Sequence, residues 1–294
     1  MKKPTTTKSL TDMLLSRLLG MMGLLCALLL ALVVFFLFKE AWPVVQSGGW
    51  MRFFNSQGWY PLEQLFGMLP MIWASIAMAV GAIILALPIG VASALFLLFY
   101  APPAVAKIYR LLLNLLAGIP SVVFGLWGLT ELVPMIATWH APGTSLLAAI
   151  LVLTLMIIPT VALTSVAALS AVPKELHAGA QALGLTRKTR IISVIIPAAK
   201  AGIISGALLA TARALGETMA VLMVAGNVVQ TPGSLFDPVR ALTANIALEM
   251  AYAMGDHRAS LFAAGLLLTV IVWGLALMAS RIVKSNGKVL SYAK

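Results

Sequence analysis

Two oppositely charged residues, Arg213 and Glu217, lie four positions apart inside a long apolar stretch of the chain. A guanidinium presents several donors in a fork that matches the oxygens of an oxyanion, and it stays charged at physiological pH. A charge within an apolar segment is costly, so it normally faces a protein interior or a water-filled path. Because side chains four apart meet on one helical face, Glu217 can compete with an anion for the guanidinium. The pair therefore predicts a transient oxyanion site at Arg213.

The same pair also has a purely structural interpretation. Small residues recur at four-residue spacing on the Arg213 side of this stretch, and such residues permit two helices to approach closely. A packing seam bridged by an ion pair would account for both charges. Ser121 is a third residue of the predicted path, because it follows Pro120 and a proline-interrupted helix exposes backbone groups that can line a cavity. A hydroxyl bonded to its own helix is the alternative for Ser121.

The other titratable residues form no catalytic or metal-binding pattern. The three histidines are scattered, and the single cysteine stands in an apolar run. Four acidic residues are assigned to external loops, where solvation accounts for them: Glu131, Asp237, Glu249 and Asp256. The ATP-binding G-x-x-x-x-G-K-[ST] motif and the H-E-x-x-H and G-x-S-x-G motifs of hydrolases do not occur in the sequence. We therefore predict a protein that is not an enzyme and that holds no metal or cofactor of its own.

The composition is that of a membrane protein. Of the 294 residues, 61% are apolar and only 10% are charged, and the mean hydropathy is +1.02. A soluble domain carries about one quarter charged residues, so a water-soluble enzyme is excluded. Apolar runs of about 20 residues are long enough to cross a bilayer as helices. The chain holds six such runs, at 18–38, 69–100, 111–129, 146–169, 201–225 and 260–283.

The basic residues predict the orientation of these spans. The first run is interpreted as a membrane anchor, since it is long for a signal peptide and lacks a small-residue cleavage pattern. Most lysines and arginines gather in the two tails and in the alternate loops around 107–110 and 171–200. The positive-inside rule therefore places both termini in the cytoplasm, in agreement with an even number of spans. The net charge of +11 thus reports orientation in a lipid bilayer, and no nucleic-acid partner is predicted.

The loop at 171–200 is long and carries helical signals. Pro173 suits a first helical position, Glu175 complements the dipole at a helix N-terminus, and Gly184 can end the helix. Apolar residues between them recur at three- and four-residue spacing, which predicts a short amphipathic helix with one apolar ridge. Such a helix can dock into a groove of a partner protein, or it can lie on lipid headgroups.

This loop resembles the cytoplasmic coupling loop of permease subunits in binding-protein-dependent ABC importers. The family pattern is Glu-Ala-Ala, three residues, Gly, nine residues and Ile-x-Leu-Pro, and Gly184 and Pro197 stand 13 positions apart as it requires. The family's glutamate is missing here, and Glu175 stands nearly one turn before its expected position. The resemblance implies docking to an ATPase subunit through Glu175, Ala178, Gly179, Ala180, Gly184 and Pro197.

Two further strings resemble the permease subunits of phosphate-specific ABC importers, AGIPSVVFGLWGL at 117–129 and RALGETMAVLMVAGN at 213–227. The second string is closer to the PstC type than to its PstA-type partner, and LTANIALEM at 242–250 also resembles an external loop of the PstC type. The resemblance implies an all-α membrane protein with six transmembrane helices and the type I ABC importer permease fold. The resemblance covers the permease core (69–284), which contains the coupling loop. The apolar runs and the basic residues predict a cytoplasmic tail (1–17), an anchor (18–38) and an external loop (39–68) before this core, and a second cytoplasmic tail (285–294) after it.

The function implied by this resemblance is ATP-driven import of inorganic phosphate across the bacterial inner membrane. The implied partners are a second permease of the PstA type, two ATPase subunits of the PstB type that bind ATP and Mg²⁺, and a phosphate-binding protein of the PstS type. Import of another oxyanion, such as sulfate or molybdate, is one alternative. An ion-coupled secondary transporter, which uses broken helices, is another, although such a protein has no use for a coupling loop.

Overall fold

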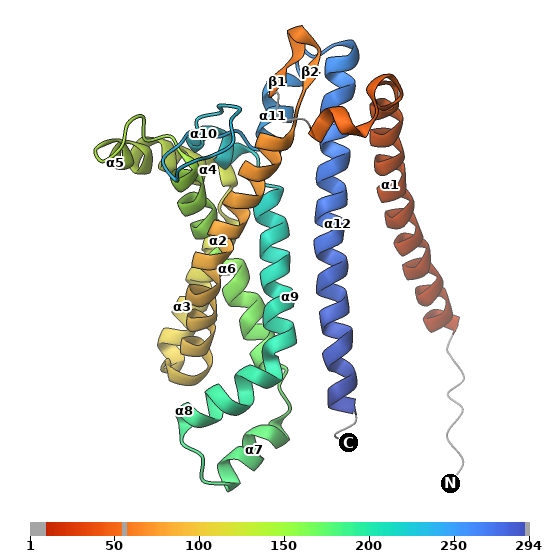
Figure 1. The fold of residues 1–294 in the computed structure, drawn as a ribbon. Coiled ribbons are helices and arrows are strands. Elements are labelled where there is room, and N and C mark those ends of the chain that lie inside the picture. Colours follow the sequence, from red (N-terminus) through yellow and green to blue (C-terminus); the bar gives the residue numbers. More distant parts are fainter. Residues whose placement is uncertain (1–9, 55–57, 292–294) are drawn as a thin grey trace.

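The computed structural model describes residues 10–54 and 58–291, which form an almost entirely helical molecule (Figure 1). The long helices are α1 (Leu10–Gly48), α2 (Leu69–Leu95), α6 (Leu146–Ser170), α9 (Ile196–Leu215) and α12 (Gly255–Ser291). Within the described residues, five helical segments are long and apolar enough to cross a membrane, and a bent pair brings the number to six. This architecture agrees with the predicted all-α membrane protein of six spans.

The third span is a bent pair of helices and not one helix. Its elements are α3 (Pro103–Gly118), α4 (Ser121–Trp127), the π-helical turn η4 (Gly128–Leu132) and α5 (Val133–Ala137). The last three form one continuous helical segment, which meets α3 at an angle of 91°. Pro120 has no N–H to donate, and the preceding Ile119 is extended, at ψ 129°. The span expected at 111–129 is therefore divided at these two residues.

The fifth span also differs from the continuous helix expected at 201–225. Its helix begins earlier, because α8 (Arg187–Arg190) and the π-helical turn η5 (Ile191–Ile195) lead directly into α9. It also ends earlier, since Gly216 follows the last residue of α9 and the chain resumes as α10 (Met219–Val224). Glycine is among the poorest helix formers, which gives the interruption a local cause.

The core of the bundle is centred on α6. This helix packs against α2 and α9, and most of its side chains are buried. Glycines on α2 let the two helices approach closely, because a Cβ at Gly81 would lie 2.6 Å from Ile150 and a Cβ at Gly90 would lie 2.7 Å from Val161. A larger side chain at either glycine would overlap the neighbouring helix, so close contact between α2 and α6 depends on these two residues.

α1 lies outside this core and packs against α12. The contact is in its second half, where Ala41 and Val44 are buried and Phe36 meets Phe262 edge to face, with 5.6 Å between ring centroids. Its first half exposes a row of leucines and methionines on the single chain. The helix extends beyond the predicted anchor at both ends. The π-helical turn η3 (Phe96–Tyr100) continues α2, so that this helical segment matches the predicted run at 69–100.

The bundle has two distinct ends (Figure 1). At the hairpin end, a small cap is formed by η1 (Trp50–Phe54), η2 (Pro61–Glu63) and the antiparallel strands β1 (Trp59–Tyr60) and β2 (Leu65–Phe66). α11 (Leu242–Glu249) lies beside this cap. At the coupling end lie α7 (Lys174–Ala182), α8 and the last residues of α12. The segment expected as an external loop at 39–68 thus contains the end of α1 and the cap, whereas the first nine residues of the predicted tail lie outside the described residues.

Candidate functional site

Arg213 lies in the last turn of α9, and its side chain is exposed on the surface of the single chain. Its Nη1 donates a 3.1 Å hydrogen bond to the hydroxyl of Thr160 on α6. Among the described residues, its Nε and Nη2 have no hydrogen-bond partner. A guanidinium on a membrane-spanning helix is too costly to leave against hydrocarbon, so this surface must face water or another protein. The donors that remain are available to an anion.

Glu217 does not lie on the same helix as Arg213. The Glu217 carboxylate accepts a 3.2 Å bond from the main-chain N–H of Thr218. In the described part of the chain, ion pairs join Glu249 to its neighbours, and none joins Arg213 to Glu217. The expected contact between side chains four residues apart requires an unbroken helix, and α9 ends between the two residues. The two charges therefore flank a helix end and do not form a bridged seam.

The interrupted third and fifth spans pack against each other. A Cβ at Gly125 of α4 would lie 2.8 Å from the Cα of Ala220, and a Cβ at Gly128 would lie 2.9 Å from Val224. Residue numbers rise together along this contact, so α4 and α10 run in the same direction. Ser121, the first residue of α4, is half-buried, and it lies about one helical turn before Gly125 and its contact with Ala220. The structure thus places Ser121 at the level of the interruption that follows Arg213.

Interrupted spans expose main-chain groups that lipid cannot satisfy. Such segments are tolerated at membrane depth only where they are buried in protein or line a water-filled cavity. The helical segment 121–137 begins at the interruption, so the positive end of its dipole lies at this level together with the Arg213 guanidinium. With Glu217 as a nearby counter-charge, this level of the bundle has the electrostatics of a weak anion site.

The coupling loop forms its predicted helix at the opposite end of the bundle. Pro173 immediately precedes α7, and Gly184 follows it with φ +71°, in the left-handed region. The N–H groups of Gly184 and Leu185 bond back to the carbonyls of Gln181 and Ala180, which is a Schellman ending. Glycine adopts this conformation without strain, so Gly184 ends the helix as the sequence predicted.

The side chains of the coupling loop point mostly away from the bundle. Five of the six residues assigned to ATPase coupling are exposed, namely Glu175, Ala178, Gly179, Gly184 and Pro197. The sixth, Ala180, is buried. Leu183 is 79% exposed, although it is a large apolar side chain outside the predicted spans. Ala180 thus packs against its own subunit, while Leu176 and Leu183 form an exposed apolar ridge.

Aromatic contacts join the coupling loop to the end of α2. His177 of α7 stacks on Phe99, with 6.4 Å between ring centroids, and the Arg187 guanidinium lies over the ring of Tyr100 at 4.6 Å. Both aromatic rings belong to η3, which continues α2. A displacement of α7 would therefore be transmitted to α2 through these contacts, and to α9 through η5, against which α7 also packs.

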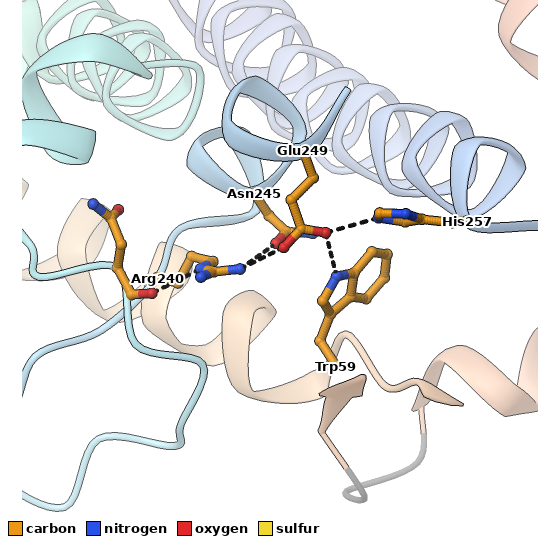
Figure 2. Close-up of polar contacts among 6 residues, drawn as sticks. Trp59, Arg240, Asn245, Glu249 and His257 are labelled. Carbon is orange, nitrogen blue, oxygen red and sulfur yellow. Dashed lines mark hydrogen bonds and ion pairs between the residues drawn. The ribbon is translucent and has the colours of Figure 1, made fainter. Parts of the chain in front are cut away.

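Glu249, which the sequence analysis assigned to solvent, is 7% exposed and accepts bonds from three side chains (Figure 2). Its Oε2 accepts from the indole Nε1 of Trp59 at 2.7 Å and lies 2.8 Å from Nε2 of His257. Its Oε1 accepts from Nη1 of Arg240 at 2.8 Å. The assignment to solvent is wrong, because donors from three separate segments enclose the carboxylate. A carboxylate only accepts, so Nε2 of His257 carries the proton in this contact.

Arg240 extends this cluster into the loop before α11. Its Nη1 also bonds Oδ1 of Asn245 at 2.9 Å, and its Nε bonds the main-chain carbonyl of Asn227 at 2.8 Å. Removing one partner of a buried ion pair costs about 3–5 kcal/mol, because the remaining charge is left uncompensated. The cluster therefore fastens β1, the loop at 227–240, α11 and the start of α12 to one another.

A cavity of about 510 Å³ opens beside this cluster. Its lining residues are Pro61, Leu62, Gln64, Glu249, Tyr252, Met254 and His257. Desolvation and the Glu249 carboxylate raise the pKa of Tyr252, with Arg240 opposing them, so the phenol is neutral at physiological pH. The lining carries an acidic residue and no lysine or arginine, which makes it a poorer anion site than Arg213. Among the described residues, no group of His, Cys, Asp or Glu side chains could hold a metal ion.

Residues 86–287 match the family described as binding-protein-dependent transport system inner membrane component. The chain is 39% identical over 245 residues to the probable ABC transporter permease protein YqgH of Bacillus subtilis, which covers 81% of this chain and 79% of that protein. It is 33% identical over 287 residues to the phosphate transport system permease protein PstC of Mesorhizobium japonicum, with 90% and 88% covered. The PstC protein of Haemophilus influenzae is 32% identical over 273 residues, with 86% of each chain covered.

Solved structures with the same fold come from ABC transporters. An inward-facing structure of the MetNI methionine ABC transporter has a chain that superposes with a TM-score of 0.61 at 22% identity, covering 77% of this chain and 98% of that chain. A chain of an amino acid ABC transporter gives a TM-score of 0.52 at 16% identity, covering 70% and 87%. The type I ABC importer permease fold is therefore confirmed. The chain belongs to the family of inner-membrane components of binding-protein-dependent transport systems, and it is a multi-pass permease subunit of that family.

Proposed function

We propose that this chain is the PstC-type permease subunit of an ATP-driven importer that moves inorganic phosphate across the bacterial inner membrane. The observation that carries the proposal is Arg213, a guanidinium that is exposed on a membrane-spanning helix and bonded through only one of its nitrogens to a described residue. The PstC proteins that match 86–90% of the chain support phosphate as the anion.

In this proposal, phosphate passes the level at which the third and fifth spans are interrupted. Its oxygens accept bonds from Nε and Nη2 of Arg213, whose orientation is set by Thr160. The Ser121 hydroxyl and the beginning of the helical segment 121–137 add donors at the same level. Glu217 lies just beyond the end of α9 and repels the anion, which shortens the residence time of the anion at Arg213.

Transport in this direction needs an energy source outside the chain. Moving one negative charge into an inside-negative cell costs about 2.3 kcal/mol per 100 mV. The chain has no ATP-binding motif, so we assign ATP and Mg²⁺ to two PstB-type ATPase subunits. The apolar ridge of α7, with the exposed Leu183, docks on one of them, and the contacts of His177 and Arg187 transmit its movement to α2.

We assign the remaining partners to surfaces of the single chain. A second permease, of the PstA type, covers the face of α9 that carries Arg213 and the exposed Leu209. A PstS-type binding protein delivers phosphate at the hairpin end. The coupling end is then cytoplasmic, and both termini face the cytoplasm, as the distribution of basic residues predicts.

The test is transport by the complex purified through an affinity tag on this chain and reconstituted into liposomes. We expect uptake of radiolabelled phosphate that requires ATP and the binding protein, and that excess sulfate or molybdate does not reduce. Competition by sulfate or molybdate at equal concentration would assign the chain to another oxyanion. Uptake by this chain alone, driven by an ion gradient without an ATPase, would contradict the assignment to an ATP-driven importer.

A further inference from the structure

α11 is a short helix that carries an unusual share of the buried polar side chains. Of the nine buried polar or charged residues described, Thr243, Asn245 and Glu249 lie on α11, and Ser75 of α2 bonds its first residue. Burying a polar group is unfavourable unless it is hydrogen-bonded, and the bond then specifies one position for its element. The position of α11 is therefore closely specified at both of its ends.

The first end of α11 is attached to the interruption in the fifth span. The Thr243 hydroxyl donates a 2.9 Å bond to the main-chain carbonyl of Glu217, a residue beyond the end of α9. One position earlier, the N–H of Leu242 donates a 3.0 Å bond to the Ser75 hydroxyl on α2. The Thr243 bond joins α11 to the main chain at the interruption, and the Leu242 bond joins α11 to α2.

The second end of α11 is attached to the cap at the hairpin end. Glu249 lies six positions after Thr243, about 9 Å further along the helix axis. Its carboxylate joins Trp59 of β1, Arg240 of the preceding loop and His257 of α12 (Figure 2). A displacement of the cap or of the start of α12 therefore pulls on α11 directly.

We propose that α11 is a strut that sets the geometry of the anion site from the hairpin end, with Thr243 and Glu249 as its two positioning residues. The arrangement of β1 and α12 around Glu249 determines where α11 lies. Thr243 then determines where the Glu217 main chain lies relative to the end of α9, and so how far the Glu217 carboxylate stands from Arg213. The effect on transport rests on the proposed function, in which Arg213 binds the carried anion.

Thr243→Val keeps the shape of the side chain and removes its hydroxyl. This substitution distinguishes a residue that positions the anion site from a residue that only stabilises the fold. If Thr243 positions the site, the variant raises the KM for phosphate uptake by the reconstituted complex about three- to tenfold, while Thr243→Ser, which keeps the hydroxyl, stays close to wild type. Thr231→Val, the same change at an exposed position of the outer loop, serves as the matched control. An unchanged KM in Thr243→Val, with only a lower melting temperature, would overturn the proposal.

A second readout does not depend on which anion is carried. In a Cys26→Ser background, Met219→Cys changes an exposed side chain and reports on the start of α10, directly after the interruption. We expect Thr243→Val to change the rate at which a charged maleimide labels this cysteine in the assembled complex, by at least about threefold. An unchanged labelling rate would contradict the strut even if phosphate is the substrate. A changed rate in a complex that carries no phosphate would leave the strut standing and reject the proposed function.

The two ends of α11 are tested together by a double-mutant cycle with Glu249→Gln. An amide has one acceptor oxygen and no charge, so it cannot satisfy the three donors that surround Glu249. If both residues act through the same helix, the labelling rate in the double variant changes by less than the product of the two single changes. A change equal to that product would show two independent contacts and contradict transmission along α11.

Discussion

The Arg213 guanidinium and the Thr160 hydroxyl form a 3.1 Å hydrogen bond that joins α9 to α6. Since α6 is the central helix of the bundle, this bond fixes the guanidinium relative to the core. The Glu217 carboxylate accepts from the main-chain N–H of Thr218 and leaves the guanidinium to other partners. The anion site is thus oriented by a neutral hydroxyl, which does not neutralise its positive charge.

Replacing Thr160 by valine tests this orientation. The change removes the acceptor of the Arg213 bond and keeps the size of the side chain, so the guanidinium loses one restraint. We expect the KM for phosphate uptake to rise about tenfold, which corresponds to ~1.4 kcal/mol and to the weak end of hydrogen bonds to charged groups. Thr160→Ser is the matched control and retains the wild-type KM. A valine variant with the wild-type KM would show that the bond does not orient Arg213.

The contact between α4 and α10 predicts a sensitive position at Gly125. A Cβ there would lie 2.8 Å from the Cα of Ala220, and a main-chain atom cannot move aside easily. We expect Gly125→Ala to lower the melting temperature of the complex in detergent by roughly 2–10 °C, as overpacking does. Gly23→Ala on α1 is the control, since a Cβ at that position meets nothing within 4 Å. Equal melting temperatures for the two variants would argue against close packing of the interrupted spans.

The exposed apolar side chain of Leu183 predicts that the contact with the ATPase depends on this residue. Leu183→Asp places a charge where a hydrophobic contact is expected, so the ATPase subunit should no longer co-purify with a tag on this chain. Leu183→Met keeps an apolar side chain of similar size and should retain the ATPase. Full recovery of the ATPase with the aspartate variant would place the docking surface elsewhere.

The cluster around Glu249 makes a prediction about stability. Trp59→Phe removes the indole donor and leaves Oε2 of Glu249 with His257 as its remaining partner. Leaving a buried charged acceptor with one bond fewer costs about 1–3 kcal/mol, which should appear as earlier thermal unfolding. Trp139→Phe is a matched control, because that indole is 69% exposed. If both variants unfold at the same temperature, the indole bond contributes little to stability.

Much of the fold could be predicted from the sequence, because apolar runs of about 20 residues and the ending of a helix at Gly184 are local properties. The interruption at Pro120 was predicted, whereas the one at Gly216 was not. Whether a proline or glycine bends, breaks or is absorbed by a membrane helix depends on its neighbours, and Pro88 shows this by standing within the continuous α2.

The candidate site was only partly accessible to sequence reasoning. Arg213 is recognisable in the sequence because a guanidinium in an apolar run is rare. Its hydrogen-bond partner Thr160 lies 53 positions away, and no sequence motif links the two residues. Glu249 is a similar case, since its indole donor lies 190 positions earlier. A local signal did exist, because Asn245 and Glu249 stand four residues apart and therefore share one face of a short apolar helix.

The central claim is that the transported phosphate binds to Arg213. The most direct test is ATP-dependent uptake of radiolabelled phosphate by liposomes that hold the Arg213→Gln complex, after co-purification has shown that the permease partner and the ATPase are still bound. Glutamine keeps a hydrogen-bonding side chain and removes the charge, so uptake should fall to the level of liposomes without ATP. Uptake at the wild-type rate by the assembled glutamine variant would show that phosphate crosses the membrane without this guanidinium.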